Sequence, residues 1–157
     1  MKPIDQPPAT DGPDLTSVVQ IVLGDLAFML TDEPPAELPA GTVWTQGEIH
    51  YVGQVSGTLR CWCTREFAAR LAANLLGLEP DMGEAQVAGE DAVRELMNVL
   101  CGQLVTLWHG TQGVFKLTIP TVRECIGVPA VADAEARHVC RLSVEGEPLL
   151  CVYQRHE

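Results

Sequence analysis

Apolar residues recur every three or four positions from about residue 88 to residue 109, a spacing that predicts one long helix. At about 100° per residue, these apolar positions share one face of the helix. They are Val93, Leu96, Met97, Leu100, Leu104 and Leu107. Gly110 follows directly, as glycine commonly does where a helix ends. The segment is therefore predicted to bury one side against a core.

The opposite side of this helix carries a narrow set of polar or small residues, called the polar stripe below. It consists of Asp91, Glu95, Asn98 and Gly102. An ordinary solvated helix face more often holds Lys, Arg and Glu, because asparagine is a mediocre helix former and glycine costs about 1 kcal/mol relative to alanine. Residues that weaken the helix on its outer side indicate that another molecule approaches the polar stripe closely.

Two further segments have helical periodicity. Residues 15 to about 31 predict an amphipathic to largely buried helix that ends before a proline-rich loop. The segment TREFAARLAANLLG predicts a helix with Thr64 as its N-cap and Gly77 at its C-terminal end. The stretch LEPDMGEAQVAGE, which leads into the long helix, is predicted to be a loop.

Strands are predicted where β-branched and aromatic residues alternate with polar ones. The segments TVWTQGEIHYVG and QVSGTLRCWC are predicted to pair as a hairpin with a tight turn near Gly53. Pro120 either ends a later strand or marks a sheet edge, because proline cannot donate a backbone hydrogen bond. The last third of the chain holds three predicted strands, VFKLTIP, ARHVCRLSVE and PLLCVYQR.

The order of these elements is helix, two strands, helix, long helix and three strands, which predicts an α+β fold. Neighbouring strands joined by short turns favour an antiparallel β-sheet, with the long α-helices packed on one side. Residues 1–13 are rich in proline and polar residues and are predicted to be a flexible tail. Residues 14–157 are then long enough to form a single domain with its own core.

The net charge of −11 restricts the possible partners. Nucleic acids and anionic membranes bind clustered positive charge, so we expect a protein or a small ligand instead. No apolar run reaches the roughly 20 residues that span a bilayer. The first residues, MKPIDQPPATDGPDL, lack the apolar segment of a signal peptide. These observations lead us to expect a cytoplasmic protein.

Cysteine and histidine could in principle form disulfides or bind a metal. The chain contains Cys61, Cys63, Cys101, Cys125, Cys140, Cys151, His50, His109, His138 and His156. No CxxC pair and no helical His/His or Cys/His spacing occurs among them, so we predict reduced, mostly buried thiols and no metal site. A glycine-rich phosphate loop, GxSxG and HExxH are also absent, which leaves the polar stripe as the candidate site for chemistry.

The spacing within the polar stripe resembles a known motif. The CheX members of the CheC/CheX/FliY chemotaxis phosphatases carry an Asp or Ser, three residues, a Glu, two residues, an Asn, and a proline about 22 residues further on. Asp91, Glu95 and Asn98 match this pattern, and Pro120 follows Asn98 after 21 residues, one short of it. The resemblance covers roughly residues 43–122, and a single copy of the motif is similar to the one-site CheX arrangement.

The resemblance implies a CheX-like protein that hydrolyses the aspartyl phosphate of a CheY-like response-regulator receiver in two-component signalling, such as chemotaxis. Asn98 would orient the attacking water, because a carboxamide offers both a donor and an acceptor. Glu95 would contact the receiver's phosphate-binding lysine. Asp91 and Gly102 would contact the partner, with Gly102 leaving room for its backbone. Mg²⁺ is expected on the receiver and no cofactor in this chain, and the family likeness implies a homodimer whose sheets join edge to edge.

Alternatives remain open from the residues alone. The same fold could serve as a non-catalytic dimeric adaptor or receiver-binding module, and six cysteines could belong to a metal or redox protein. Glu95 could simply be a solvated helix carboxylate that pairs with Arg94 or another neighbour. Asp91 could complement the positive N-terminal end of the helix. Gly102 could relieve crowding where another helix crosses.

Overall fold

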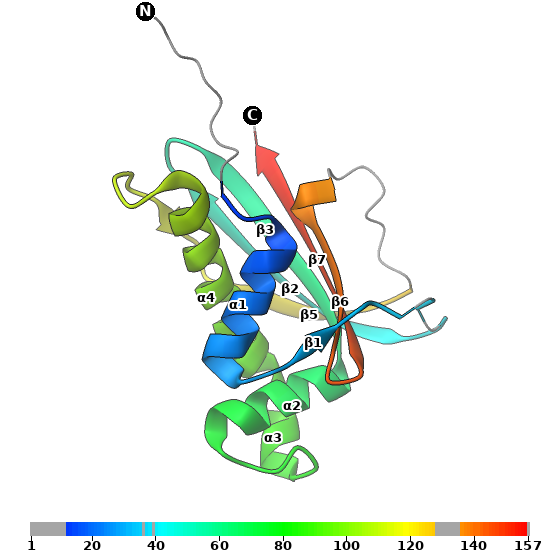
Figure 1. Cartoon of the computed structure of the whole chain (residues 1–157). Helices are drawn as coiled ribbons and strands as arrows, with labels where there is room; N and C mark the ends of the chain where they lie inside the picture. Colours follow the sequence, from blue (N-terminus) through cyan, green and yellow to red (C-terminus); the bar gives the residue numbers. More distant parts are fainter. Residues whose placement is uncertain (1–11, 36, 39, 128–135, 157) are drawn as a thin grey trace, which may run out of the picture.

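An antiparallel sheet forms the centre of the fold (Figure 1). The computed structural model describes residues 12–35, 37–38, 40–127 and 136–156. Across these residues, seven strands are arranged in the order β1-β6-β7-β3-β2-β4, and β5 also pairs with β2. The strands are β1 (Thr31–Asp32), β2 (Val43–Val52), β3 (Ser56–Thr64), β4 (Lys116–Leu117), β5 (Thr121–Ile126), β6 (Val139–Val144) and β7 (Glu147–His156).

Helices cover one face of this sheet (Figure 1). They are α1 (Leu15–Ala27), α2 (Arg65–Leu76), α3 (Gly83–Val87) and α4 (Gly89–His109), and the short 3₁₀ helix η1 (Ala136–His138) precedes β6. Buried side chains of α1, α2 and α4 pack with the inward-facing side chains of β2, β3, β6 and β7 in one core. The predicted α+β fold with an antiparallel sheet and helices on one side is therefore confirmed.

Local sequence signals correctly placed the two helices that matter most for the candidate site. The Thr64 hydroxyl accepts a hydrogen bond from the backbone N–H of Phe67 at 3.0 Å, as an N-cap does. Gly77 ends α2 with a left-handed φ of 73°, which glycine adopts without strain. Helix α4 ends at Gly110 as predicted.

The prediction for the apolar face of α4 was wrong at one position. Leu107 is 38% exposed, whereas the five apolar positions before it are buried. In this last turn the inward contacts come from Trp108 instead. Its ring packs edge-on against Tyr153, and its Nε1–H donates to the carbonyl oxygen of Pro13 at 2.7 Å. The buried side of the helix has thus moved by one residue at its end.

The predicted loop between α2 and α4 contains a short helix, α3. Its turns are held by backbone hydrogen bonds such as the one from the Ala88 N–H to the Glu84 carbonyl oxygen. Ala85 is fully buried and anchors it. One apolar contact in five residues is too little for periodicity to reveal, so the loop prediction was wrong here. The predicted flexible tail, residues 1–13, lies outside the described residues except for Gly12 and Pro13.

The other differences lie at helix and strand ends. Helix α1 stops at Ala27, because Phe28 takes a left-handed conformation and donates its N–H to the Gly24 carbonyl oxygen. Only two residues of the predicted strand VFKLTIP, forming β4, pair with β2. Pro120 follows this strand, as predicted. Strand β5 then pairs with the same edge of β2, and the sequence did not predict this strand.

Candidate functional site

Helix α4 presents the polar stripe on its outer side. The side chains of Asp91, Glu95 and Asn98 are exposed, and Gly102 is half-buried. On the opposite side of the helix, Leu96 and Leu100 are buried in the core. The predicted grouping of the four residues on one solvent-accessible face follows from this burial pattern.

A glycine in the sheet allows α4 to lie close to it. A Cβ atom at Gly47 of β2 would lie 2.9 Å from Cγ of Met97 and 3.1 Å from Cγ1 of Val93. Distances this short would push the helix away from the sheet. Gly47 therefore sets the height of α4, and with it the position of the polar stripe. Sequence analysis missed this role, because nothing local to Gly47 distinguishes a close approach from a bulge.

Glu95 and Asn98 have no partner within the part of the chain that the structure describes: neither side chain makes a hydrogen bond or an ion pair there. The alternative in which Arg94 pairs with Glu95 is not what the structure shows. Instead, Nη1 of Arg94 donates to Oδ1 of Asp91 at 2.8 Å, and Nη2 lies 4.0 Å from Oε1 of Glu90. Glu95 and Asn98 are thus available to an incoming molecule.

Gly102 is not required by packing within the chain. A Cβ atom at this position would meet no atom of the described residues within 4 Å, so none of the described helices crosses here and crowding by them does not explain the glycine. Among the described residues, nothing fills the space above Gly102. A partner's backbone could approach α4 more closely at Gly102 than at any residue with a side chain.

A cluster of aromatic residues and histidine fixes the C-terminal end of α4. The hydroxyl oxygen of Tyr51 lies 2.7 Å from that of Tyr153 and 3.0 Å from Nε2 of His109. Phe115 stacks against the His109 ring and also packs edge-on against Tyr51. Burial raises the pKa of Tyr51 well above its usual range, so this hydroxyl stays neutral and hydrogen-bonded. The cluster joins α4 to β2 and β7, contacts between distant segments that periodicity does not reveal.

His109 makes the stability of this end of α4 dependent on pH. Burial lowers the pKa of His109 below its usual 6.5, and the nearby positive charge of Arg155 lowers it further. Between the two pKa values the unfolded chain binds more protons than the folded one, so stability must fall as pH falls below about 6.5 and level off below the folded pKa. We expect this loss to be smaller in His109→Gln. Chemical denaturation of both proteins between pH 5 and 8 measures it, and parallel pH profiles would contradict the assignment.

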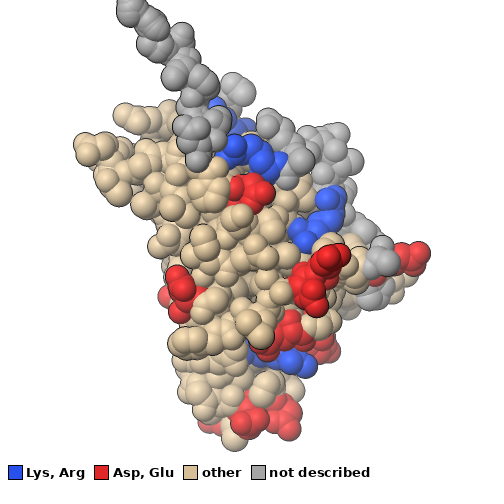
Figure 2. All heavy atoms as spheres, viewed as in Figure 1, with Lys and Arg blue, Asp and Glu red and all other residues tan. Residues whose placement is uncertain are grey.

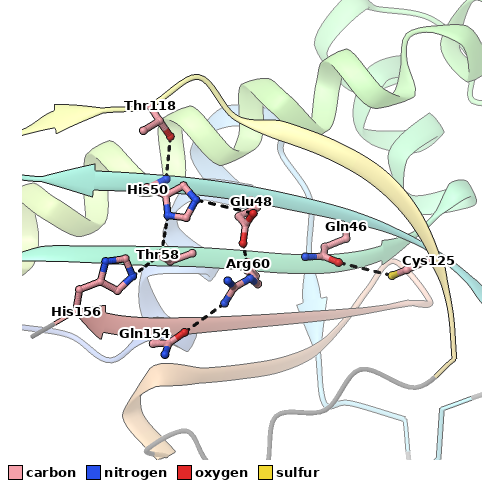
Figure 3. A network of polar contacts seen from close by, with 9 residues as sticks. All are labelled: Gln46, Glu48, His50, Thr58, Arg60, Thr118, Cys125, Gln154 and His156. Carbon is pink, nitrogen blue, oxygen red and sulfur yellow. Dashed lines mark hydrogen bonds and ion pairs between the residues drawn. The ribbon is translucent and has the colours of Figure 1, made fainter.

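The face of the sheet opposite the helices carries a polar network (Figure 3). Nδ1 of His50 and Nε2 of His156 both lie 2.7 Å from the hydroxyl oxygen of Thr58, which is 1% exposed. Beside them, Glu48 pairs with Arg60 at 2.5 Å. The two histidines therefore satisfy a buried hydroxyl group.

The cysteines are free thiols, five of them buried and Cys125 half-buried. Burial raises the pKa of the Cys101 thiol to about 12, which keeps it protonated and unreactive. Within residues 12–35, 37–38, 40–127 and 136–156, no group of three or more His, Cys, Asp and Glu side chains is arranged to hold a metal ion. No helix in these ranges is long and apolar enough to cross a membrane.

Charged side chains are scattered over the face that carries α1, with wide uncharged areas between them (Figure 2). Acidic groups outnumber basic ones in the chain as a whole, 21 to 10.

Comparison with solved structures shows the same fold in chemotaxis proteins. CheX from Desulfovibrio desulfuricans superimposes with a TM-score of 0.65 at 16% identity, over 90% of this chain and 96% of that one. A putative chemotaxis protein from Desulfovibrio vulgaris Hildenborough gives 0.66 at 18% identity, over 90% and 94% of the two chains. The CheX of a CheX–CheY–BeF3–Mg²⁺ complex from Borrelia burgdorferi gives 0.59 at 19% identity, over 91% and 96%.

Sequence comparison assigns the family. A search of curated proteins gave no significant match. The family model for the chemotaxis phosphatase CheX matches residues 46–141, which include β3, α2, α4 and the whole polar stripe. The match spans more than half of the 157 residues. The chain therefore belongs to the CheX family of chemotaxis phosphatases.

Proposed function

We propose that this protein is a phosphatase that hydrolyses the aspartyl phosphate of a CheY-like receiver domain. The observation that carries the proposal is the pair Glu95 and Asn98, two exposed side chains with the CheX spacing, on one face of a well-anchored helix and without partners among the described residues. A related CheX from Borrelia burgdorferi forms a complex with CheY, BeF3 and Mg²⁺, which supports a receiver as the partner here.

Asn98 is proposed to hold the attacking water. Hydrolysis forms a bond between the water oxygen and phosphorus, breaks the bond to the aspartate oxygen, and leaves inorganic phosphate and a free carboxylate. Such a reaction depends on placing the water in line with the leaving oxygen. The carboxamide can accept a hydrogen bond from the water while its N–H₂ group donates to another oxygen. The buried neighbours Met97 and Leu100 fix the helix turn that bears it.

Glu95 is proposed to dock the receiver through a lysine. Its carboxylate is exposed and unpaired in the described chain, so it can bind an ammonium group without first losing an internal ion pair. It lies three residues before Asn98, and residues three apart are neighbours on a helix surface. Mg²⁺, which we expect on the receiver, would offset negative charge on the phosphoryl oxygens.

We further expect the protein to act in the cytoplasm as a homodimer. Strand β5 pairs with β2 along one edge, and among the described strands none pairs with its other edge. Ile119 and Ile126, before and at the end of β5, are both exposed. An open sheet edge flanked by exposed apolar residues favours pairing with a second copy, which would join the two sheets.

The test is the rate of phosphate loss from phosphorylated CheY-like receivers, ideally from the same genome, with and without the protein. Acceleration in proportion to added protein is the expected result. A parallel binding experiment with the same receivers separates the two readings of the fold. Binding without acceleration across several receivers would contradict the phosphatase and indicate the non-catalytic adaptor.

A further inference from the structure

Arg94 is the one lysine or arginine in α4, and it borders the polar stripe. It precedes Asn98 by one helical turn. Its guanidinium group is held on two sides, by Oδ1 of Asp91 at 2.8 Å and by Oε1 of Glu90 at 4.0 Å. The Arg94 side chain is 39% exposed, whereas that of Asp91 is 86% exposed. The cation is therefore partly covered and lies beside two carboxylates, yet it is still reachable from solvent.

The negative charges around the polar stripe require a cation if the proposed phosphatase is to dock a receiver. Glu90, Asp91 and Glu95 give this end of α4 three carboxylates. A receiver that holds a phosphoryl group and Mg²⁺ must itself present carboxylates around the metal. Like charges facing one another across an interface oppose binding. Glu95 already has a proposed lysine partner on the receiver. The negative charges of Glu90 and Asp91 remain to be offset, and these are the two carboxylates that contact Arg94.

The direction of the Arg94 side chain decides what it can reach. Helical side chains point towards the N-terminal end of their helix, and the contact with Asp91 shows that this one does. Its guanidinium group thus lies near the turn of Asp91, about 10 Å along the helix axis from Asn98. If Asn98 stands beside the phosphoryl group, Arg94 reaches the rim of the receiver's pocket and not the phosphoryl oxygens.

We propose that Arg94 is the docking cation of this site and that Asp91 is a positioning residue that holds it. A guanidinium group has five N–H donors, and those not used by Asp91 and Glu90 can bind a carboxylate on the receiver beside the phosphorylated aspartate. The proposal rests on the phosphatase function above. In this proposal Asp91 does not contact the partner directly, but acts on it through Arg94.

The first test compares Arg94→Ala with Arg141→Ala, which removes the same charge from the opposite face of the sheet. For Arg94→Ala, KM for the phosphorylated receiver should rise about tenfold, the worth of one charge-assisted hydrogen bond, while kcat stays within about twofold. Arg141→Ala should leave both unchanged. The tenfold difference should shrink in high salt, because exposed charges are screened. An unchanged KM in Arg94→Ala, or a fall in kcat alone, would overturn the proposal.

The second test examines Asp91 through a double-mutant cycle. Asp91→Ala should raise KM in the wild-type background but should not raise it further in Arg94→Ala, because its role in holding Arg94 is then already lost. An equal loss in both backgrounds would place Asp91 directly against the partner. Arg94→Lys should recover part of the loss, since lysine keeps the charge without the bidentate geometry. Absence of activity in the wild type would contradict the proposed function itself, whereas normal activity with normal KM in the variants contradicts only this inference.

Discussion

Replacing Asn98 by alanine is expected to lower the maximal rate of receiver dephosphorylation by about 100- to 1000-fold, as losing one group that orients the reacting atoms typically does. The side chain is exposed and makes no hydrogen bond to a described residue, so its loss should not disturb the fold. Alanine also has a higher helix propensity than asparagine, so Asn98→Ala should be as stable as the wild type or slightly more stable. Single-turnover phosphate loss at saturating protein measures the rate, and thermal melting measures stability.

Gln103→Ala is the matched control for this variant. Gln103 is an exposed carboxamide on the same helix, but it lies outside the polar stripe. Its removal should leave the rate unchanged. Asn98→Gln adds one methylene, which displaces the carboxamide, and should be nearly as slow as Asn98→Ala. A wild-type rate in Asn98→Ala would remove Asn98 from the mechanism, and a rate loss in Gln103→Ala would shift the site to another face of α4.

The helices and the polar stripe were predictable because both depend on local rules. Which side chains share a face follows from helical periodicity, so Glu95 and Asn98 could be placed together from the sequence. Thr64 and Gly77 mark the ends of α2 by side-chain and backbone preferences that act over a few residues. Strand β5 was missed because its pairing with β2 is a tertiary contact, and its short alternating pattern also fits a loop.

The ion pairs within the candidate site were less predictable from the sequence than the residues that form it. Arg94 could pair with either of two earlier carboxylates or with Glu95 beside it, and only the side-chain conformation shows that it contacts Asp91 and Glu90. Likewise, the position of α4 depends on Gly47, which is distant in sequence. The sequence thus identifies which residues share the outer face of α4, while packing decides which of them have no partner among the described residues.

Replacing Gly102 by leucine is expected to stabilise the protein and at the same time impair it. Leucine restores about 1 kcal/mol of helix propensity, and a Cβ atom at this position meets no described atom within 4 Å, so the fold should accept it. The added side chain would occupy the space proposed for the receiver's backbone. Moving the receiver by about 1 Å from its productive position should lower kcat/KM by about 100-fold.

Gly24→Ala in α1 and Gly102→Ala separate the two effects. Gly24 is also helical, and a Cβ atom there meets no described atom either, so both alanine variants should gain stability. Gly24→Ala should keep wild-type kcat/KM, and Gly102→Ala should lose less than Gly102→Leu because it adds only a methyl group. Thermal melts and steady-state rates on one receiver measure both quantities. A Gly102→Leu protein that is stabilised and fully active would show that the receiver does not approach α4 at this glycine, because a leucine side chain in that space would then not hinder docking.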